Sequence, residues 1–490
     1  MSMGLSSPNM DTARRLEAIL LVGLVFLACA ANGASRGHLF GVGAPRRTLT
    51  DTTNRKVFDV TAFGAKPEAG DSKGRKMREL PGGGDIDAPL PQLPVAGGGD
   101  SGSDDGNDDG LNPDADNDTG MAFIKTWVAA CRGEYKGPAK VLIPKGTFLA
   151  GPVVFQGPCT SSKEPIVLEI QGEVKATTDL SDYSSPEWIS FENIDGLIIT
   201  GDGVINGQGE KTWNGAGCHS DDCPHSPSNI KFQKVKNALI EGITSLNSKY
   251  FHYHITDSSN VTMNNVHITA PGDSPNTDGC HISNSDNVKV INSIIGTGDD
   301  CVSVGQGARQ VTINNVTCGP GHGISVGSLG KYKDEQPVVG VTVTNCTLSN
   351  TTNGARIKTW AGPNRGEARG IIFDNLVLDH VKAPIVIDQH YGEKKSGGDN
   401  KNAKDPNSGK QSLYKLSDIH FRNIKGTSSH NVAVSLSCSA TNPCDGVELN
   451  NIDIALGGAG TAKKTDVASE CYNAKVTTKG TMNPAAPACQ

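Results

Sequence analysis

Within residues 274–332, a stretch rich in glycine, proline and serine, four side chains stand in Gly-rich turn motifs that suit acid–base chemistry. They are three aspartates and a histidine: Asp278, Asp299, Asp300 and His322. Carboxylates that lie close together repel one another, which raises the pKa of at least one of them. A protonated carboxyl beside an ionised one is the combination that cleaves glycosidic bonds. The cluster therefore indicates an acid–base site, provided that the fold brings its members together.

Two cations and an aromatic side chain follow this cluster. Arg356 and Lys358 flank a single isoleucine, and Tyr391 comes later in the chain. The cations could form ion pairs with the carboxylates or bind an anionic substrate, and the tyrosine offers an aromatic face to a sugar ring. A lone aspartate in a β-turn is usually only a turn residue. The succession of these motifs along the chain is what favours a functional site.

The elements that must position these residues recur along the sequence. Each unit is a short run in which apolar and polar residues alternate, and it ends in asparagine or a similar turn residue. The units begin at residues 196, 237, 260, 287, 310, 340, 370, 418 and 446. From 237 to 340 the units follow one another at short and nearly regular intervals. Repeats with a period of roughly 20–50 residues and no intervening helices predict a solenoid of stacked β coils. A β-sandwich is the alternative, although it does not require regular repeats.

The repeat also predicts which residues meet. Asp299 lies in the unit that begins at residue 287, and His322 lies in the next unit, which begins at residue 310. The two residues are equally far from the starts of their units, so they should occupy equivalent places on adjacent coils. Asp300 projects from the same turn as Asp299. Asp278 and Lys358 lie further into their units, which begin at 260 and 340, and again at equal distances. Stacked coils are about 4.8 Å apart. The coils should therefore gather these charges on one face.

The N-terminal part of the chain is interpreted as sequence outside the repeat. Residues 1–34 resemble a secretory signal, because Arg14 and Arg15 precede an apolar run over 18–31 and small residues follow it. A membrane anchor is the alternative, but the run is shorter than the roughly 20 residues that span a bilayer. Residues 35–56 are expected to be a leader or propeptide, and no later stretch is long and apolar enough to span a bilayer.

The repeat domain is predicted to cover residues 57–490, with a strand at 57–65 and an insert at 66–118. This insert is rich in Pro, Gly and Asp, and we expect it to be disordered. Its final aspartates do not fit an EF-hand calcium loop, which has glycine at its sixth position and glutamate at its twelfth. Here the glycine, Gly120, is at the seventh position, and the twelfth is Lys125. Residues 119–131 then show apolar side chains at helical spacing, which predicts a single helix that caps the coils.

Charge and cysteine content limit the function classes. The net charge of -7 argues against a general nucleic-acid surface. Of 13 cysteines, one lies in the signal and twelve remain, so disulfides are expected in an oxidising compartment. Plausible local pairs are Cys218–Cys223, Cys301–Cys318 and Cys438–Cys444. A metal site at 218–225 is the weaker alternative to a disulfide-closed loop. Sequons occur at Asn117, Asn260, Asn315, Asn345 and Asn350.

The sequence resembles the polygalacturonases of glycoside hydrolase family 28. The motifs that carry the resemblance are NTDG at 276–279, GDD at 298–300, GHG at 321–323, RIK at 356–358 and the later Tyr391. The resemblance runs from residue 57 to the C-terminus, interrupted by the insert, and is closest to the plant pollen-type exopolygalacturonases. The departures are Cys280, where an apolar residue usually follows NTDG, and Gly392, where a cysteine commonly follows the tyrosine. These two positions leave the disulfide pattern around Cys280 and Cys346 open.

The resemblance implies an all-β fold, a right-handed parallel β-helix, and hydrolysis of α-1,4-galacturonosyl bonds in de-esterified pectin with inversion. It implies these roles: Asp299 as the acid, Asp278 and Asp300 activating water, His322 maintaining the acid, and Asn276, Arg356, Lys358 and Tyr391 binding substrate. It implies no metal and no cofactor. The protein is then expected to be a secreted, monomeric cell-wall enzyme with an acidic pH optimum and no membrane attachment in its mature form.

Alternatives remain at the level of activity. Exo attack is favoured by the pollen-type resemblance, whereas endo attack depends on whether loops at 208–228 and 392–413 leave the ends of the cleft open. A lyase acting on the same polymer would need a base with cations, usually calcium, and no protonated acid. A non-catalytic pectin-binding wall protein on the same fold is the alternative from a different class.

Overall fold

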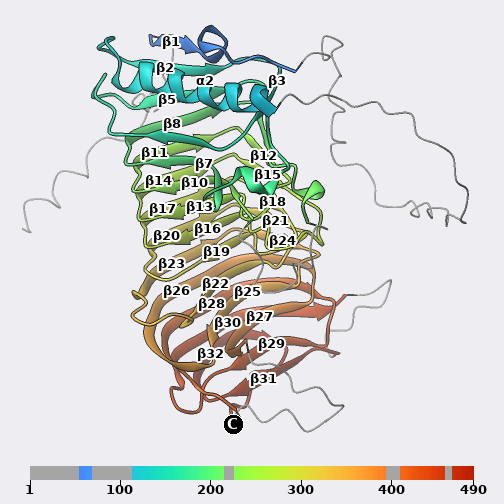
Figure 1. Cartoon of the computed structure of the whole chain (residues 1–490). Coiled ribbons are helices and arrows are strands. Elements are labelled where there is room, and N and C mark those ends of the chain that lie inside the picture. The colour runs from blue at the N-terminus through green and yellow to red at the C-terminus, as the bar shows by residue number, and fades with distance from the viewer. Residues whose placement is uncertain (1–53, 69–112, 214–225, 393–408, 458–465) are drawn as a thin grey trace, which may run out of the picture. The chain divides into compact units, whose positions relative to one another are not determined.

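The computed structural model describes residues 54–68, 113–213, 226–392, 409–457 and 466–490. In these residues the chain winds into coils of parallel strands, each coil stacked on the one before (Figure 1). Every strand pairing among the described residues is parallel, which excludes the β-sandwich alternative. The prediction of a right-handed parallel β-helix is confirmed. The expected signal sequence, most of the insert and the pair Cys218–Cys223 lie outside the described residues.

Three rows of strands run along the stack. The first row is the 11-stranded sheet: β4 (Val153–Gln156), β7 (Glu187–Glu192), β10 (Ser228–Gln233), β13 (Tyr253–Thr256), β16 (Cys280–Ser283), β19 (Val302–Val304), β22 (Ile324–Leu329), β25 (Asn353–Trp360), β27 (Ala383–Tyr391), β29 (Val432–Ser437) and β31 (Ala468–Tyr472). The second row begins with β1 (Lys56–Asp59), β2 (Ala139–Ile143), β5 (Ile166–Ile170), β8 (Asp195–Gly201), β11 (Lys236–Glu241), β14 (Ser259–Asn264), β17 (Asp286–Ile291), β20 (Arg309–Asn314) and β23 (Val338–Thr344). The third row holds β3 (Thr147–Ala150), β6 (Glu173–Ala176), β9 (Val204–Asn206), β12 (Thr244–Leu246), β15 (His267–Thr269), β18 (Ile294–Gly296), β21 (Thr317–Cys318) and β24 (Thr347–Ser349). At the C-terminal end four longer strands continue the second and third rows together: β26 (Gly362–Val381), β28 (Ser412–Ser428), β30 (Cys444–Leu456) and β32 (Ala474–Asn483).

The strand register reproduces the sequence repeat. The residue just before each unit pairs with its counterpart on the next coil: Lys236 with Ser259, Ser259 with Asp286, Asp286 with Arg309, and Arg309 with Val339. The intervals between units in the sequence are therefore the offsets between paired strands. Inward positions carry β-branched side chains, such as Val261, Val288, Val311 and Val341, all at most 1% exposed. Such side chains pack well on a pleated surface, and they build one continuous apolar core along the stack.

Asparagines form the turns that begin and end the strands of the second row. Asn260 and Asn287 adopt the left-handed conformation with φ of 54° and 52°, which asparagine tolerates better than most residues. The Asn260 amide donates to Asn237 at 2.6 Å, and the Asn287 amide donates to Asn260 at 3.2 Å. Side-chain amides therefore hydrogen-bond from coil to coil outside the backbone ladder.

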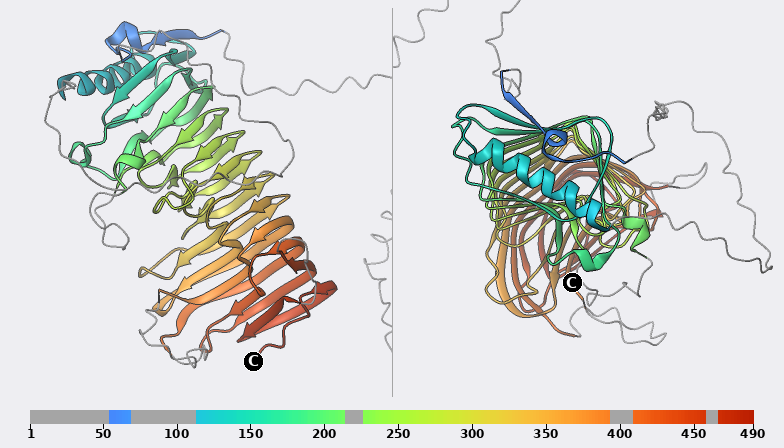
Figure 2. Two further views of the ribbon diagram at one scale, coloured as in Figure 1. Left: turned by 90° about the vertical axis from the view of Figure 1, so that its right-hand side faces the viewer. Right: turned by 45° about the horizontal axis from the view of Figure 1, so that its top comes forward.

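One helix, α2 (Pro113–Arg132), covers the first coils (Figure 2). Its Phe123 and Trp127 are buried, and Trp127 starts an aromatic stack through Phe155, Phe191 and Phe232 at centroid distances of 5.0 to 5.3 Å. The predicted cap is confirmed, but its start is wrong. The helix begins at Pro113, inside the segment expected to be disordered, because proline and acidic residues suit the first turn of a helix.

Two further boundaries differ from the sequence predictions. The first strand ends at Asp59 rather than continuing to 65, because the Asp59 carboxylate caps a 3-10 helix, η1 (Val60–Phe63), by accepting from Thr61 N. Short 3-10 helices also occur at η2 (Leu180–Asp182) and η3 (Gly209–Lys211). The last two residues of the expected leader belong to the fold: Lys56 lies in β1, and Arg55 donates to Pro165 O at 2.6 Å.

Disulfides tie the described coils at both ends and in the middle. The predicted pairs Cys301–Cys318 and Cys438–Cys444 are present. Two more pairs, Cys131–Cys159 and Cys471–Cys489, secure the capping helix and the C-terminus. Cys280 and Cys346 are buried free thiols, which answers the question left open at these positions. Among the described residues, no helix is both long and apolar enough to cross a membrane.

Candidate active site

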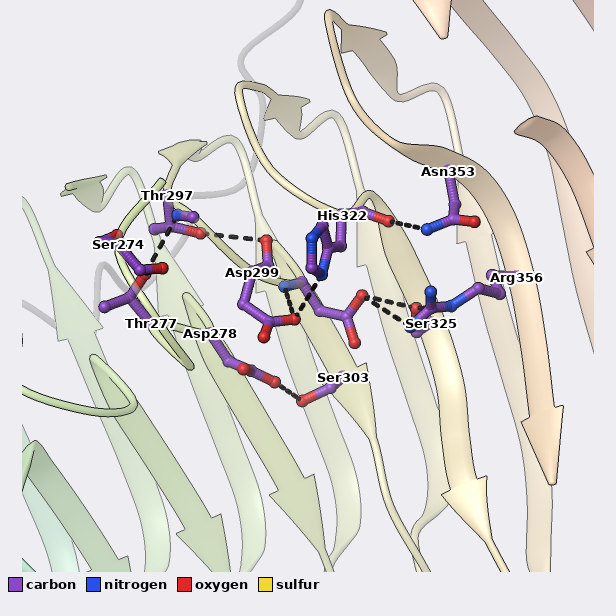
Figure 3. A network of polar contacts seen from close by, with 12 residues as sticks. Ser274, Thr277, Asp278, Thr297, Asp299, Ser303, His322, Ser325, Asn353 and Arg356 are labelled. Atoms are coloured by element: carbon purple, nitrogen blue, oxygen red, sulfur yellow. Dashed lines mark hydrogen bonds and ion pairs between the residues drawn. The ribbon is translucent and has the colours of Figure 1, made fainter. Parts of the chain in front are cut away.

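Four of the predicted site residues, Asp278, Asp299, His322 and Arg356, lie close together along the first row (Figure 3), whose strand order puts them in the middle of the stack. Asp278 precedes β16, Asp299 and Asp300 precede β19, and His322 precedes β22. Successive turns thus deliver the acidic and imidazole groups from adjacent coils, while the following strand, β25, carries the two cations. Strands and tight turns of a stacked array hold side chains more rigidly than long loops do.

Asp299 and His322 form the first pair in this site. His322 Nδ1 lies 2.9 Å from Asp299 Oδ1, and the His322 backbone N–H donates to Asp299 O at 2.8 Å. The repeat register predicted this contact between adjacent coils. These two turns lie between two strand pairings: Ile295 pairs with Cys318 before the turns, and Val302 pairs with Ile324 after them. The turn that carries the histidine is therefore slightly shorter than the turn that carries the two aspartates.

Asp300 is the most heavily paired of the three aspartates in the site. Its side chain is 1% exposed. Lys358 Nζ lies 3.0 Å from Oδ2, Ser325 Oγ donates to Oδ1 at 2.7 Å, and an Arg356 nitrogen lies 3.6 Å from Oδ1. A buried carboxylate needs such partners, because removing a charge from water is costly unless it is paired and hydrogen-bonded.

Asp278 has a different environment. It is 6% exposed, and its Oδ2 accepts one hydrogen bond from Ser303 Oγ at 2.6 Å. Burial raises the pKa of Asp278 well above its usual range, and the negative charges of Asp299 and Asp300 raise it further. The Ser303 hydrogen bond and the Lys358 charge act in the opposite direction without reversing the shift. Burial beside two negative charges therefore favours the protonated form of Asp278.

The pKa of Asp299 moves the other way. Burial alone would raise it, but the hydrogen bond and positive charge of His322, together with Lys358, lower it. The pKa of His322 is raised in turn, first by its hydrogen bond to Asp299 and then by the charges of both neighbouring aspartates, against the effect of burial. Both shifts favour an ion pair between the two side chains in the free site, with the shared proton on the His322 side.

The two remaining predicted residues lie at the margins. Tyr391 ends β27 and packs against Trp360 at 5.1 Å, with Lys358 Nζ 5.3 Å from its ring centroid. Asn276 is exposed in the turn before Asp278, with φ of 52°. Within the described part of the chain, no hydrogen bond joins the Asn276 side chain to the carboxylates. The structure brings the other predicted residues into contact and leaves Asn276 beside them.

Metal binding does not suit this cluster well. Donor atoms of Asp299, Asp300 and His322 lie within 4.8 Å of one another, which is the spacing of a possible metal site. However, the Lys358 ammonium already contacts Asp300, and a cation bound there would be repelled by it. The arrangement is suited instead to holding and moving protons among three carboxyls.

Several positioning residues escaped the sequence reasoning. Ser303 and Ser325 hold the carboxylates of the preceding coils, Thr277 Oγ1 accepts from Gly298 N at 3.0 Å, and Asn353 donates to His322 O at 3.2 Å. The two serines interrupt the apolar runs VSV and ISV. A polar residue at the same place in two successive short strands is the signal that could have revealed them.

Comparison with known proteins agrees with this fold and site. The model of the family "Glycosyl hydrolases family 28" matches residues 134–479. An exopolygalacturonase of Arabidopsis thaliana is 39% identical over 95% of this chain and 94% of its own length, and an exopolygalacturonase of Platanus acerifolia is 43% identical over 75% of this chain and 93% of its own. Among solved structures, the endo-xylogalacturonan hydrolase of Aspergillus tubingensis is similar with a TM-score of 0.62 at 24% identity, covering 76% of this chain and 98% of that chain.

Proposed function

This chain belongs to the glycosyl hydrolases of family 28, and we propose that it hydrolyses α-1,4-galacturonosyl bonds of de-esterified pectin as a secreted polygalacturonase. The observation that carries the proposal is the pairing of Asp299 with His322 beside Asp278, whose pKa is raised while that of Asp299 is lowered. Hydrolysis of a glycosidic bond needs one group that donates a proton and another that accepts one from water. These residues supply both groups within neighbouring coils.

We assign the acid to Asp299, with His322 as the residue that holds its proton. Below the raised pKa of His322 the pair carries one proton on its 2.9 Å contact. A bound sugar displaces water, and the loss of water disfavours two opposite charges relative to two neutral groups. The proton then moves from Nδ1 to the Asp299 carboxylate, which delivers it to the leaving oxygen.

We assign the activation of water to Asp278, assisted by Asp300. Above its raised pKa, Asp278 is ionised and accepts a proton from the attacking water. An oxygen of Asp300 lies within 4.8 Å of Asp299, which is closer than the roughly 6.5–9.5 Å between acid and base in inverting glycosidases. Asp300 therefore orients the water and Asp278 takes its proton. Inversion is expected, and the anomer that forms first, observed by proton NMR, tests it.

The cations are suited to an acidic polymer. Arg356 and Lys358 lie on β25 beside the carboxylates, and the Lys358 ammonium also faces the Tyr391 ring. A uronate carboxylate can share these cations with Asp300, while the tyrosine ring packs against the sugar. We propose that both cations and Tyr391 bind substrate, with Asn276 contributing from the adjacent turn.

Exo attack is the mode we propose, because the relatives from Arabidopsis thaliana and Platanus acerifolia carry the name exopolygalacturonase. Sizing the first products from polygalacturonate distinguishes the modes: monomer alone indicates exo attack, and mixed oligomers indicate endo attack. We further propose that the protein acts as a monomer in the cell wall.

The decisive experiment is release of reducing ends from polygalacturonate by the purified protein. Asp299→Asn should lower kcat by at least about 100-fold, the contribution of a general acid. Asp273→Asn is the matched control, since Asp273 is exposed in the neighbouring turn. Unsaturated products that absorb in the ultraviolet would indicate a lyase. No product from the wild-type protein would favour the non-catalytic alternative.

A further inference from the structure

A three-residue arrangement is repeated on successive coils of the site. Asp278 accepts from Ser303 at 2.6 Å, and Asp300 accepts from Ser325 at 2.7 Å (Figure 3). The two serines pair with each other in the strand register. Each serine also contacts a nitrogen of a basic side chain: Ser325 accepts from Arg356 Nε at 3.1 Å, and Ser303 Oγ lies 2.8 Å from His281 Nδ1. The repeating unit is therefore a carboxylate, a hydroxyl and a nitrogen.

The two copies differ in what the nitrogen can do. A serine hydroxyl has one proton to donate. An arginine nitrogen can only donate, so the Ser325 proton must point to Asp300. A histidine nitrogen either donates or accepts, depending on its tautomer. The direction of the hydrogen bonds at Asp278 is thus set by His281, whereas the direction at Asp300 is fixed.

His281 is held neutral and in one orientation. Burial lowers its pKa to about 4, with a further contribution from the Lys358 charge that Asp300 partly offsets. Its ring stacks on Phe251 at 4.9 Å and 22°, and His254 meets it edge-on at 5.3 Å. The charged or titratable groups facing this assembly are Asp278, Asp299, Asp300, Lys358, Cys280 and His254. An imidazole so confined keeps one N–H, and Ser303 lies within reach of Nδ1.

We propose that Ser303 and His281 are positioning residues for the catalytic base: His281 donates Nδ1–H to Ser303, which commits the serine proton to Asp278 Oδ2. This arrangement favours the ionised form of Asp278 and leaves Oδ1 as the oxygen that takes the proton of the attacking water. It compensates for the burial of Asp278 and for the charges of Asp299 and Asp300. The inference rests on the proposed hydrolytic function and extends it to two residues on neighbouring strands.

The test is the pH dependence of kcat/KM on polygalacturonate for Ser303→Ala, His281→Leu and His281→Asn. Losing a hydrogen bond to a charged group should move the acidic limb of the profile up by about one pH unit in Ser303→Ala. In His281→Leu the Ser303 hydroxyl remains but is free to turn and accept from protonated Asp278, so the limb should move up by a smaller amount. In His281→Asn the side-chain amide stands at the place of Nδ1 and can still donate, so the limb should stay where it is in the wild type. A structural role alone would lower kcat without moving the limb.

Ser325→Ala is the matched variant. It removes the same atom on the next coil, where Lys358 still pairs with Asp300, so its acidic limb should not move whatever its kcat. If His281→Leu does not fold, His281→Gln replaces it, because a glutamine amide reaches the place of Nε2 rather than Nδ1. An unmoved limb in Ser303→Ala, or an equal shift in His281→Asn and His281→Leu, would overturn the proposal. An inactive wild-type protein would instead overturn the hydrolytic function itself.

Discussion

Replacing Lys358 by methionine tests how far the site depends on one buried ion pair. The Lys358 side chain is 9% exposed and that of its partner Asp300 is 1% exposed, with 3.0 Å between Nζ and Oδ2. Methionine is similar in length and fits an apolar environment. The substitution therefore removes the charge with little change in packing. It leaves the buried Asp300 carboxylate without the positive charge that lies nearest to it.

The expected loss of stability follows from that geometry. Removing one partner of a buried ion pair lowers the free energy of unfolding by about 3–5 kcal/mol. Arg356 remains 3.6 Å from the other Asp300 oxygen, so we expect a value near the lower end, about 3 kcal/mol. Asp300→Asn leaves the ammonium unpaired and should cost a similar amount. The double variant should cost about 2 kcal/mol less than the sum, because neither charge of the pair remains.

Urea unfolding at pH 7 measures these differences, with tryptophan fluorescence and circular dichroism recorded together because long repeat arrays do not always unfold in one step. Lys475→Met is the control, since Lys475 forms an ion pair of 3.4 Å with Asp445 in which the side chains are 77% and 60% exposed. That change should cost at most about 1 kcal/mol. Additive costs in the Lys358 and Asp300 double variant would refute the reasoning, as would a loss below about 1 kcal/mol in Lys358→Met.

Three further predictions concern pH and packing. The activity of the wild type should fall as the pH rises through the raised pKa of His322, and His322→Gln should move this alkaline limb of kcat/KM to lower pH; an unmoved limb would contradict the assignment. Hydrogen bonds from Arg422 and His420 lower the pKa of Glu448 to about 2. Its contribution to stability is therefore present above its usual pKa and lost as the pH falls towards 2. Glu448→Gln should cost about 1–3 kcal/mol at pH 7 and little near pH 2, and an equal cost at both pH values in thermal unfolding would be the opposite result. Trp127→Ala should destabilise the capping end by about 3–5 kcal/mol in urea, whereas Val128→Ala, on the exposed side of the helix, should change stability by less than about 0.5 kcal/mol.

The repeat in the second row explains why much of the fold was predictable. Apolar alternation and asparagine turns recur there with spacings equal to the strand offsets, so stacking could be deduced without any contact information. Some short strands of the first row, such as β19, are buried at every position, so their burial shows no alternation of period two. The row that carries the site was therefore the least visible in the sequence.

The partners of the carboxylates were harder to predict than the carboxylates themselves. Asp299 and His322 share a position within their repeat units, so their contact could be inferred. Ser303 belongs to the coil after that of Asp278 and contacts it only because a turn and a strand of different coils face each other. The proton distribution depends on burial and on charges from three coils, which spacing alone does not provide.

The position of the site within the stack determines how heat inactivates the protein. Its four strands, β16 to β25, are the fifth to eighth of the eleven in the first row (Figure 1). In a solenoid each coil touches only its neighbours, and a terminal coil has one neighbour instead of two, so we expect structure to be lost first from the terminal coils. Several coils separate the carboxylates from either terminus. Warming should therefore reduce the circular dichroism signal of strands before it abolishes catalysis, and shortening the stack by a terminal coil should lower heat resistance while sparing turnover at moderate temperature.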